Sequence, residues 1–234
     1  MFTTTRPPSM TLTLRVLSTL LGYPDARLRE ALPELRGALR TECALAPDRL
    51  EGILALIASL EVADALLVES DYVELFDRGR ATSLHLFEHV HGDSRERGPV
   101  MVDLGETYAR AGLLLDDGEL PDYLPAVLEF VASQPPREAK AFLGEMSHIF
   151  NAILGALKER DSAYAGVLLG LLELAGETTQ ATEPAAEVPL DEAWAEPIVF
   201  DGCSTQGRAK PGQPQPIRVV RKAARNESQP GAST

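Results

Sequence analysis

Residues 24–60 read PDARLREALPELRGALRTECALAPDRLEGILALIASL, and the spacing of apolar side chains in this stretch decides the fold class. In its first half, leucines recur at intervals of four, three and four residues, which places them on one face of a helix: Leu28, Leu32, Leu35 and Leu39. The second half begins at Ala46-Pro47-Asp48, a typical helix start, and its core-facing positions are Leu50, Ile53, Leu54, Ile57 and Leu60. Pro33 interrupts the first pattern and predicts a kink, or a break into two short helices.

The same periodicity recurs on both sides of this stretch. Upstream, a helix with Leu14, Leu17 and Leu21 is expected to end at Gly22-Tyr23-Pro24. Downstream, a helix is expected over 63–77, with Leu67, Tyr72, Leu75 and Phe76, and a short one over 83–90, with Thr82 or Ser83 as its N-cap. A further helix is expected from Pro99, with Val102, Leu104, Tyr108 and Leu113. Three more are expected to begin at Gly118, at Pro135-Pro136 (the longest) and at residue 163, the last of them ending at residue 175. No stretch of useful length alternates as a strand does. We therefore expect an all-α fold, a single helical-bundle domain of antiparallel helices over residues 10–176.

Residues 177–234 differ in composition from the rest of the chain. They are rich in Pro, Gly, Ser, Thr and Gln and poor in large apolar side chains, so they cannot offset the entropy of ordering a chain. The part up to Asp201 is acidic, whereas residues 208–226 hold six basic residues and no acidic one. We expect a flexible, disordered tail that is first acidic and then basic.

The overall charge limits the partners that the chain can have. A net charge of −13 and a pI near 4.8 argue against nucleic acid or an anionic membrane as the main partner. The two cysteines, Cys43 and Cys203, are far apart and outside any zinc-knuckle spacing, which is typical of a reducing, cytoplasmic environment. No apolar run approaches the length of a membrane span, so we expect none.

Residues 72–104 read YVELFDRGRATSLHLFEHVHGDSRERGPVMVDL and hold three of the four histidines. His85, Glu88 and His89 match the H-x-x-E-H pattern, in which two imidazoles one helical turn apart bind zinc while the glutamate activates a water molecule. A zinc-dependent hydrolase is therefore one hypothesis. In the alternative, the histidines bond neighbouring carboxylates or backbone while the apolar residues between them are buried. Phosphate-loop, dinucleotide and serine-nucleophile motifs are absent from the sequence.

The whole run 72–104 resembles the signature segment of the NarJ-type chaperones, which assemble the molybdenum-containing respiratory nitrate reductase. Residues 17–35, LSTLLGYPDARLREALPEL, resemble the N-terminal region of these proteins. Residues 118–132, GELPDYLPAVLEFVA, resemble a segment shared with the wider TorD-like family of redox-enzyme chaperones. Three separated segments agree in order over about residues 12–175, which is far more specific than a five-letter zinc pattern.

The resemblance implies an all-helical cytoplasmic binding protein that is not an enzyme and carries no cofactor or metal of its own. Such chaperones bind the N-terminal segment of the apo catalytic (alpha) subunit of nitrate reductase. They keep it competent for molybdenum cofactor insertion and are not part of the final enzyme. Proteins that deliver the molybdenum cofactor are further candidate partners, whereas nucleic acid is not expected.

Carried over residue by residue, the matching segments indicate a client-binding surface. Its members are Tyr72, Phe76, Asp77, Arg78, His85, Phe87, Glu88, His89, His91, Asp93, Arg95, Arg97, Glu119, Pro121, Asp122 and Tyr123. Among these, Phe76, Phe87 and Tyr123 are expected to supply apolar contacts, and Glu88 and Asp122 to meet basic groups of a peptide. In the alternative, Asp77, Arg78, Asp93 and Arg95 form a salt-bridged scaffold, and Phe76 belongs to the core.

Overall fold

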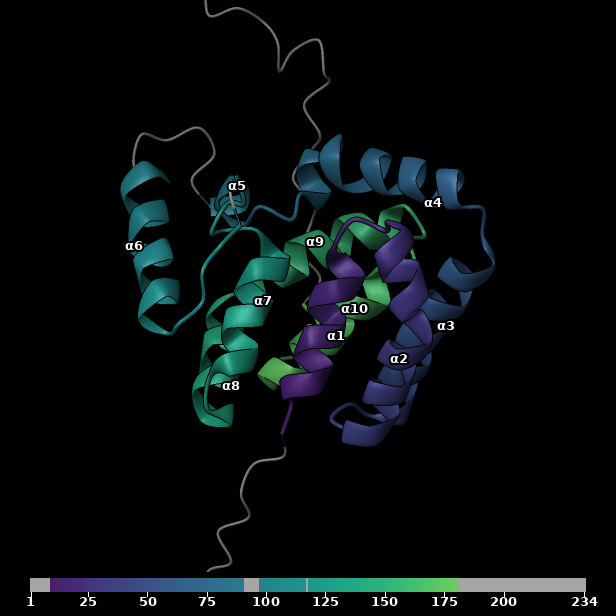
Figure 1. Ribbon diagram of the computed structural model, residues 1–234, viewed down its shortest axis with the longest axis horizontal. Coiled ribbons are helices and arrows are strands. Elements are labelled where there is room, and N and C mark those ends of the chain that lie inside the picture. Colours follow the sequence, from purple (N-terminus) through teal and green to yellow (C-terminus); the bar gives the residue numbers. More distant parts are fainter. Residues whose placement is uncertain (1–8, 91–96, 117, 181–234) are drawn as a thin grey trace, which may run out of the picture. The chain divides into compact units, whose positions relative to one another are not determined.

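The computed structural model describes residues 9–90, 97–116 and 118–180, and of Arg97 only the backbone. Every regular element in these residues is a helix, which confirms the all-α prediction (Figure 1). The α-helices are α1 (Thr11–Leu21), α2 (Ala26–Glu42), α3 (Pro47–Val62), α4 (Ala65–Tyr72), α5 (Leu86–Val90), α6 (Arg97–Arg110), α7 (Leu124–Ser133), α8 (Pro136–Glu145), α9 (Ser147–Glu159) and α10 (Ala165–Ala175). A π-helical turn, Val73–Asp77, extends α4, and a 3₁₀ turn, Arg80–Thr82, follows it. In the described part of the chain, no helix is both long and apolar enough to span a membrane.

The core is built around α1 and α10, which contact each other and most of the remaining helices (Figure 1). Most residues of both helices are buried, because their sequences are rich in leucine and other apolar residues. Glycine allows α10 to approach α3 closely. A Cβ atom at Gly166 would lie 3.3 Å from the backbone carbon of Gly52, and one at Gly170 would lie 3.2 Å from a side-chain carbon of Ile53. Larger residues at these two positions would push the helices apart.

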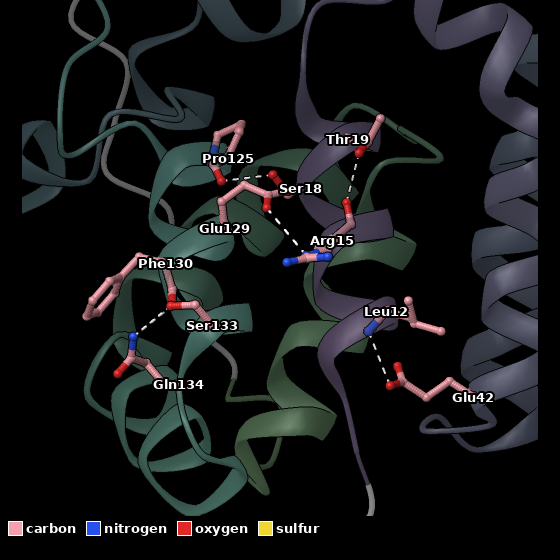
Figure 2. A network of polar contacts seen from close by, with 10 residues as sticks. All are labelled: Leu12, Arg15, Ser18, Thr19, Glu42, Pro125, Glu129, Phe130, Ser133 and Gln134. Atoms are coloured by element: carbon pink, nitrogen blue, oxygen red, sulfur yellow. Dashed lines mark hydrogen bonds and ion pairs between the residues drawn. The ribbon is translucent and has the colours of Figure 1, made fainter. Parts of the chain in front are cut away.

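Polar contacts fasten α1 to the helices beside it (Figure 2). The buried hydroxyl of Ser18 donates a 2.8 Å hydrogen bond to the carbonyl of Pro125 at the start of α7. At the first turn of α1, the backbone N–H groups of Leu12 and Thr13 donate to the carboxylate of Glu42, at 3.2 and 2.6 Å. Glu42, the last residue of α2, therefore caps α1 from a different helix.

The charge of Glu42 is favoured by this arrangement. Partial burial raises the pKa of its carboxyl, but hydrogen bonds from Thr13, Ser9 and Leu12 together lower it by more. The net result is a pKa below the ordinary value of 4.5. The ionised carboxylate thus serves as the N-cap that the sequence of α1 lacks.

Several predicted helix boundaries are wrong, and the helix expected from Gly118 begins only at Leu124. Of the kink or break predicted at Pro33, the break does not occur, since α2 runs from Ala26 to Glu42. The proline is on the exposed face, where water can satisfy the carbonyl group that loses its donor. The long helix expected from Pro136 is instead two helices, which meet at Met146. Gly144 and Ser147 flank this junction, and both residue types lower helix propensity.

The helices that the sequence predicted over 63–77 and 83–90 also differ in detail. Leu67 is exposed, and the buried positions of α4 are Val68 and Tyr72. The helix over 83–90 begins only at Leu86, because the carbonyl of Leu84 accepts a hydrogen bond from Leu124 and His85 forms a bridge with Tyr123. Val102, an apolar residue of α6, is exposed as well. In each case a tertiary contact, or its absence, overrides the local pattern.

Candidate functional site

Two segments that the sequence singled out come together in the fold. Residues 72–90 and 119–124, which we call the signature corner, are joined by an antiparallel bridge between His85 and Tyr123. On either side of the bridge, the N–H of Leu86 donates to the carbonyl of Asp122 at 3.0 Å, and the N–H of Leu124 donates to the carbonyl of Leu84 at 2.8 Å. These backbone bonds fix the start of α5 against the start of α7.

Asp122 lies at the centre of the signature corner and is fully buried, with 0% of its surface exposed. One carboxylate oxygen, Oδ2, accepts a 3.1 Å hydrogen bond from the N–H of Phe87. The other, Oδ1, lies 3.5 Å from Nδ1 of His85. A buried carboxylate is stable only when its environment compensates for lost water, and here the first turn of α5 supplies a donor. Asp122 therefore positions α5 and orients the imidazole of His85.

An aromatic cluster supports the inner side of the corner. The buried hydroxyl of Tyr72 donates a 2.7 Å hydrogen bond to the carbonyl of Leu21 and lies 3.2 Å from the hydroxyl of Tyr123. The ring of Phe76 is 4.9 Å from that of Tyr72 and 5.1 Å from that of Tyr164. Burial raises the pKa of Tyr72 and raises that of Tyr164 to about 12, so both phenols are neutral. The assignment of Phe76 to the core is confirmed.

The turn after the π-helix depends on two residues that the sequence analysis did not place in the client-binding surface, Gly79 and Thr82. The hydroxyl of Thr82 donates to the carbonyl groups of Leu75 and Gly79. A Cβ atom at Gly79 would lie 2.7 Å from the carbonyl oxygen of Leu75, which is closer than real Cβ atoms come. The turn thus requires glycine at position 79, because no room is left for a Cβ atom, and it requires Thr82 for its hydrogen bonds to two carbonyl groups. The signal was present in the sequence as a glycine and a small hydroxyl residue three positions apart in DRGRAT.

The remaining predicted residues lie around this corner. Arg78 pairs with Glu74 at 2.9 Å and is exposed, as are Asp77 and Glu119. Phe87, Glu88 and His89 are half-buried on α5. Pro121 accepts a 2.8 Å hydrogen bond from the hydroxyl of Tyr108, which ties α6 to the corner. His91, Asp93 and Arg95 lie outside the described residues, as does the side chain of Arg97.

The zinc-hydrolase interpretation of His85, Glu88 and His89 is wrong. His85 precedes α5 and belongs to the bridge with Tyr123, so the two imidazoles do not project from one helix as the pattern requires. The Nε2 atom of His89 lies 2.8 Å from the carbonyl oxygen of Ser83. Among the described residues, no group of three histidine, cysteine or acidic side chains is arranged to hold a metal ion.

Comparison with known proteins identifies relatives of this chain. The family model described as nitrate reductase delta subunit matches residues 23–169, which include both segments of the signature corner. The nitrate reductase molybdenum cofactor assembly chaperone NarJ of Escherichia coli is 42% identical over 180 residues, or 77% of this chain and 76% of that protein. The nitrate reductase-like protein NarX of Mycobacterium tuberculosis is 35% identical over 149 residues, which are 63% of this chain and 22% of that protein.

A solved structure shares the fold. A crystal structure from Archaeoglobus fulgidus, described as that of a redox enzyme maturation protein, aligns with a TM-score of 0.53. The alignment covers 72% of this chain and 94% of the other, at 17% sequence identity. This likeness concerns the helical architecture alone.

Proposed function

The chain belongs to the nitrate reductase delta subunit family, and we propose that it is an assembly chaperone for nitrate reductase and not a catalyst. The observation that carries this proposal is the 42% identity to a named molybdenum cofactor assembly chaperone over three quarters of both chains. The geometry supports the proposal, because the most distinctive residues of the sequence pack together in one corner of the fold. Asp122, the most buried acid of that corner, is engaged by Phe87 and His85.

We propose further that the chain binds the N-terminal segment of the apo catalytic subunit and keeps it competent for molybdenum cofactor insertion. In this proposal, the buried members of the signature corner, such as Tyr72, Phe76 and Asp122, hold its shape. The residues that remain reachable contact the client: Asp77, Arg78, Phe87, Glu88, His89 and Glu119. Half-buried aromatic surface beside exposed charge of both signs suits a peptide with apolar and polar faces. Proteins that deliver the cofactor are proposed as transient partners of the same complex.

The proposed location is the cytoplasm, where the apo subunit would be met before cofactor insertion. Cys43 is an exposed free thiol, as expected in a reducing compartment. Fractionation of cells with an antibody against the chain would test this, and recovery outside the cytoplasmic fraction would contradict it.

Isothermal titration calorimetry tests client binding. The titrant is a synthetic peptide that copies the N-terminal segment of the catalytic subunit from the same organism, and a scrambled peptide of the same composition is the control. The proposal predicts saturable binding of the first peptide only. Absence of binding to this peptide and to the full apo subunit would refute the client assignment.

A further inference from the structure

The outward face of α4 is apolar in its first turn. Leu66 is 76% exposed and Leu67 is 57% exposed, and Val62, at the end of the preceding helix, is 85% exposed. The inward face of the same helix carries Val68 and Tyr72, both buried. Figure 1 shows α4 along the upper margin of the bundle. These large apolar side chains at the start of one helix therefore face solvent where they could contact another molecule.

The same segment concentrates negative charge. Residues 61–77 contain six acidic residues and no basic one, although the net charge of the whole chain is only −13. Arginines pair with two of these acids, Glu61 and Glu74, so the segment stays negative after pairing. Asp71 and Glu74 are exposed on α4 and on the π-helical turn that extends it. We call the set formed by Val62, Leu66, Leu67, Ser70, Asp71 and Glu74 the α4 outer surface.

The charge of this surface selects the kind of molecule that can cover it. A second copy of the chain would bring two acidic segments together, and nucleic acid or an anionic membrane would be repelled as well. A cationic helix with an apolar stripe fits instead. Asp71 lies four residues after Leu67 and is therefore one helical turn, about 5–6 Å, along the same face. A partner helix could pack apolar side chains against Leu66 and Leu67. Its lysine or arginine side chains could then contact Asp71 and Glu74.

We propose that the α4 outer surface, which meets the signature corner at Glu74, is a docking site for a basic amphipathic helix of the client polypeptide. This inference rests on the proposed chaperone function for the identity of the client, but its chemistry comes from α4 itself. The apolar residues supply contact area and the acids supply orientation and a faster encounter. Two contact regions on one client would also raise the overall affinity without demanding a tight grip at either.

Two pairs of variants test the inference. Leu66→Ser combined with Leu67→Ser removes apolar contact without changing charge, and Leu114→Ser is the matched control at a residue that is 86% exposed in the loop before α7. Asp71→Lys reverses one charge of the surface, and Glu51→Lys does the same at an exposed position of α3. The probes are the purified apo catalytic subunit and a synthetic leucine–lysine peptide of helical spacing, each titrated into the full-length chain. Urea unfolding checks that every variant remains folded.

The inference predicts that the double serine variant and Asp71→Lys each raise the dissociation constant for both probes by about tenfold or more, as expected for central interface residues. The two controls should stay within about twofold of the wild type. Equal weakening by variants and controls would show only general attraction to an acidic protein and would overturn the inference. Unchanged binding in the α4 variants, with normal binding by the wild type, would also overturn it while leaving the chaperone function intact. Failure of the wild type to bind the apo subunit would instead refute the proposed function.

Discussion

Replacement of Asp122 by alanine should destabilise the protein and weaken client binding through the position of α5. The side chain is fully buried, and its Oδ2 atom accepts the N–H of Phe87 at 3.1 Å. A hydrogen bond to a charged group contributes about 1.5–3 kcal/mol, and the N–H that loses its acceptor adds to the cost. We therefore expect the free energy of unfolding to fall by about 2–4 kcal/mol. A loss of about 3 kcal/mol corresponds to a melting temperature lower by about 6–12 °C in a domain of this size.

Urea unfolding followed by circular dichroism measures this loss, and titration of the client peptide measures binding by the folded fraction. Asp122→Asn keeps the size of the side chain and one acceptor oxygen, so it should restore most of the stability. Glu119→Gln, an exposed neighbour, should change the free energy of unfolding by less than about 0.5 kcal/mol. The reasoning is refuted if Asp122→Ala is as stable as the wild type. Normal stability with abolished peptide binding would instead show the direct client contact that the sequence alone predicted.

Three further perturbations test other parts of the structure. Gly79→Ala should lower the free energy of unfolding by about 2 kcal/mol or more, because the new Cβ atom would meet the carbonyl of Leu75. The control Gly37→Ala, where no atom lies near the new Cβ, should be neutral or stabilising. Equal free energies of unfolding for the two variants in urea would contradict this. Glu42→Gln should cost about 0.5–1 kcal/mol at pH 7. Because the folded-state pKa of Glu42 is lowered, the stability difference between the wild type and this variant should be complete above pH 4.5 and should vanish as the pH falls through the folded-state pKa. Thermal unfolding at a series of pH values measures it. A stability difference that persists in acid would rule out the charge of Glu42 as its cause. Tyr72→Phe should lower the free energy of unfolding by about 1 kcal/mol, because it loses the hydrogen bond to the carbonyl of Leu21. Tyr23→Phe should cost less, because the hydroxyl of Tyr23 bonds Glu69 on the exposed side of the molecule. The reverse order of stabilities in differential scanning calorimetry would count against the role given to Tyr72.

Much of the fold follows from local patterns in the sequence. The leucine spacing of α2 and α3 predicted both helices, and Gly22 and Gly176 lie where α1 and α10 end. The errors have a common physical origin. The shortening of α5 depends on Asp122, which lies 35 residues after Phe87 in the sequence, and no periodicity within 83–90 can report a partner that distant.

The candidate site shows the same limit. The sequence identified the segments of the signature corner but not the role of each residue within it. The resemblance to the chaperone family indicated that Asp122 meets basic groups of a client, whereas the fold buries this side chain completely. Likewise, His85 and His89 share a helical face only if residues 83–90 are all helical, and the bridge to Tyr123 prevents that. Whether the exposed residues of the corner contact the client stays a prediction.

The molybdenum content of the finished enzyme tests the central claim most directly. The catalytic subunit of nitrate reductase would be purified from cells with and without this chain, and molybdenum would be measured by mass spectrometry per mole of subunit. The chaperone function predicts near-stoichiometric molybdenum when the chain is present and a severe deficit when it is absent, with recovery on re-expression. Equal molybdenum content in the two preparations would contradict it.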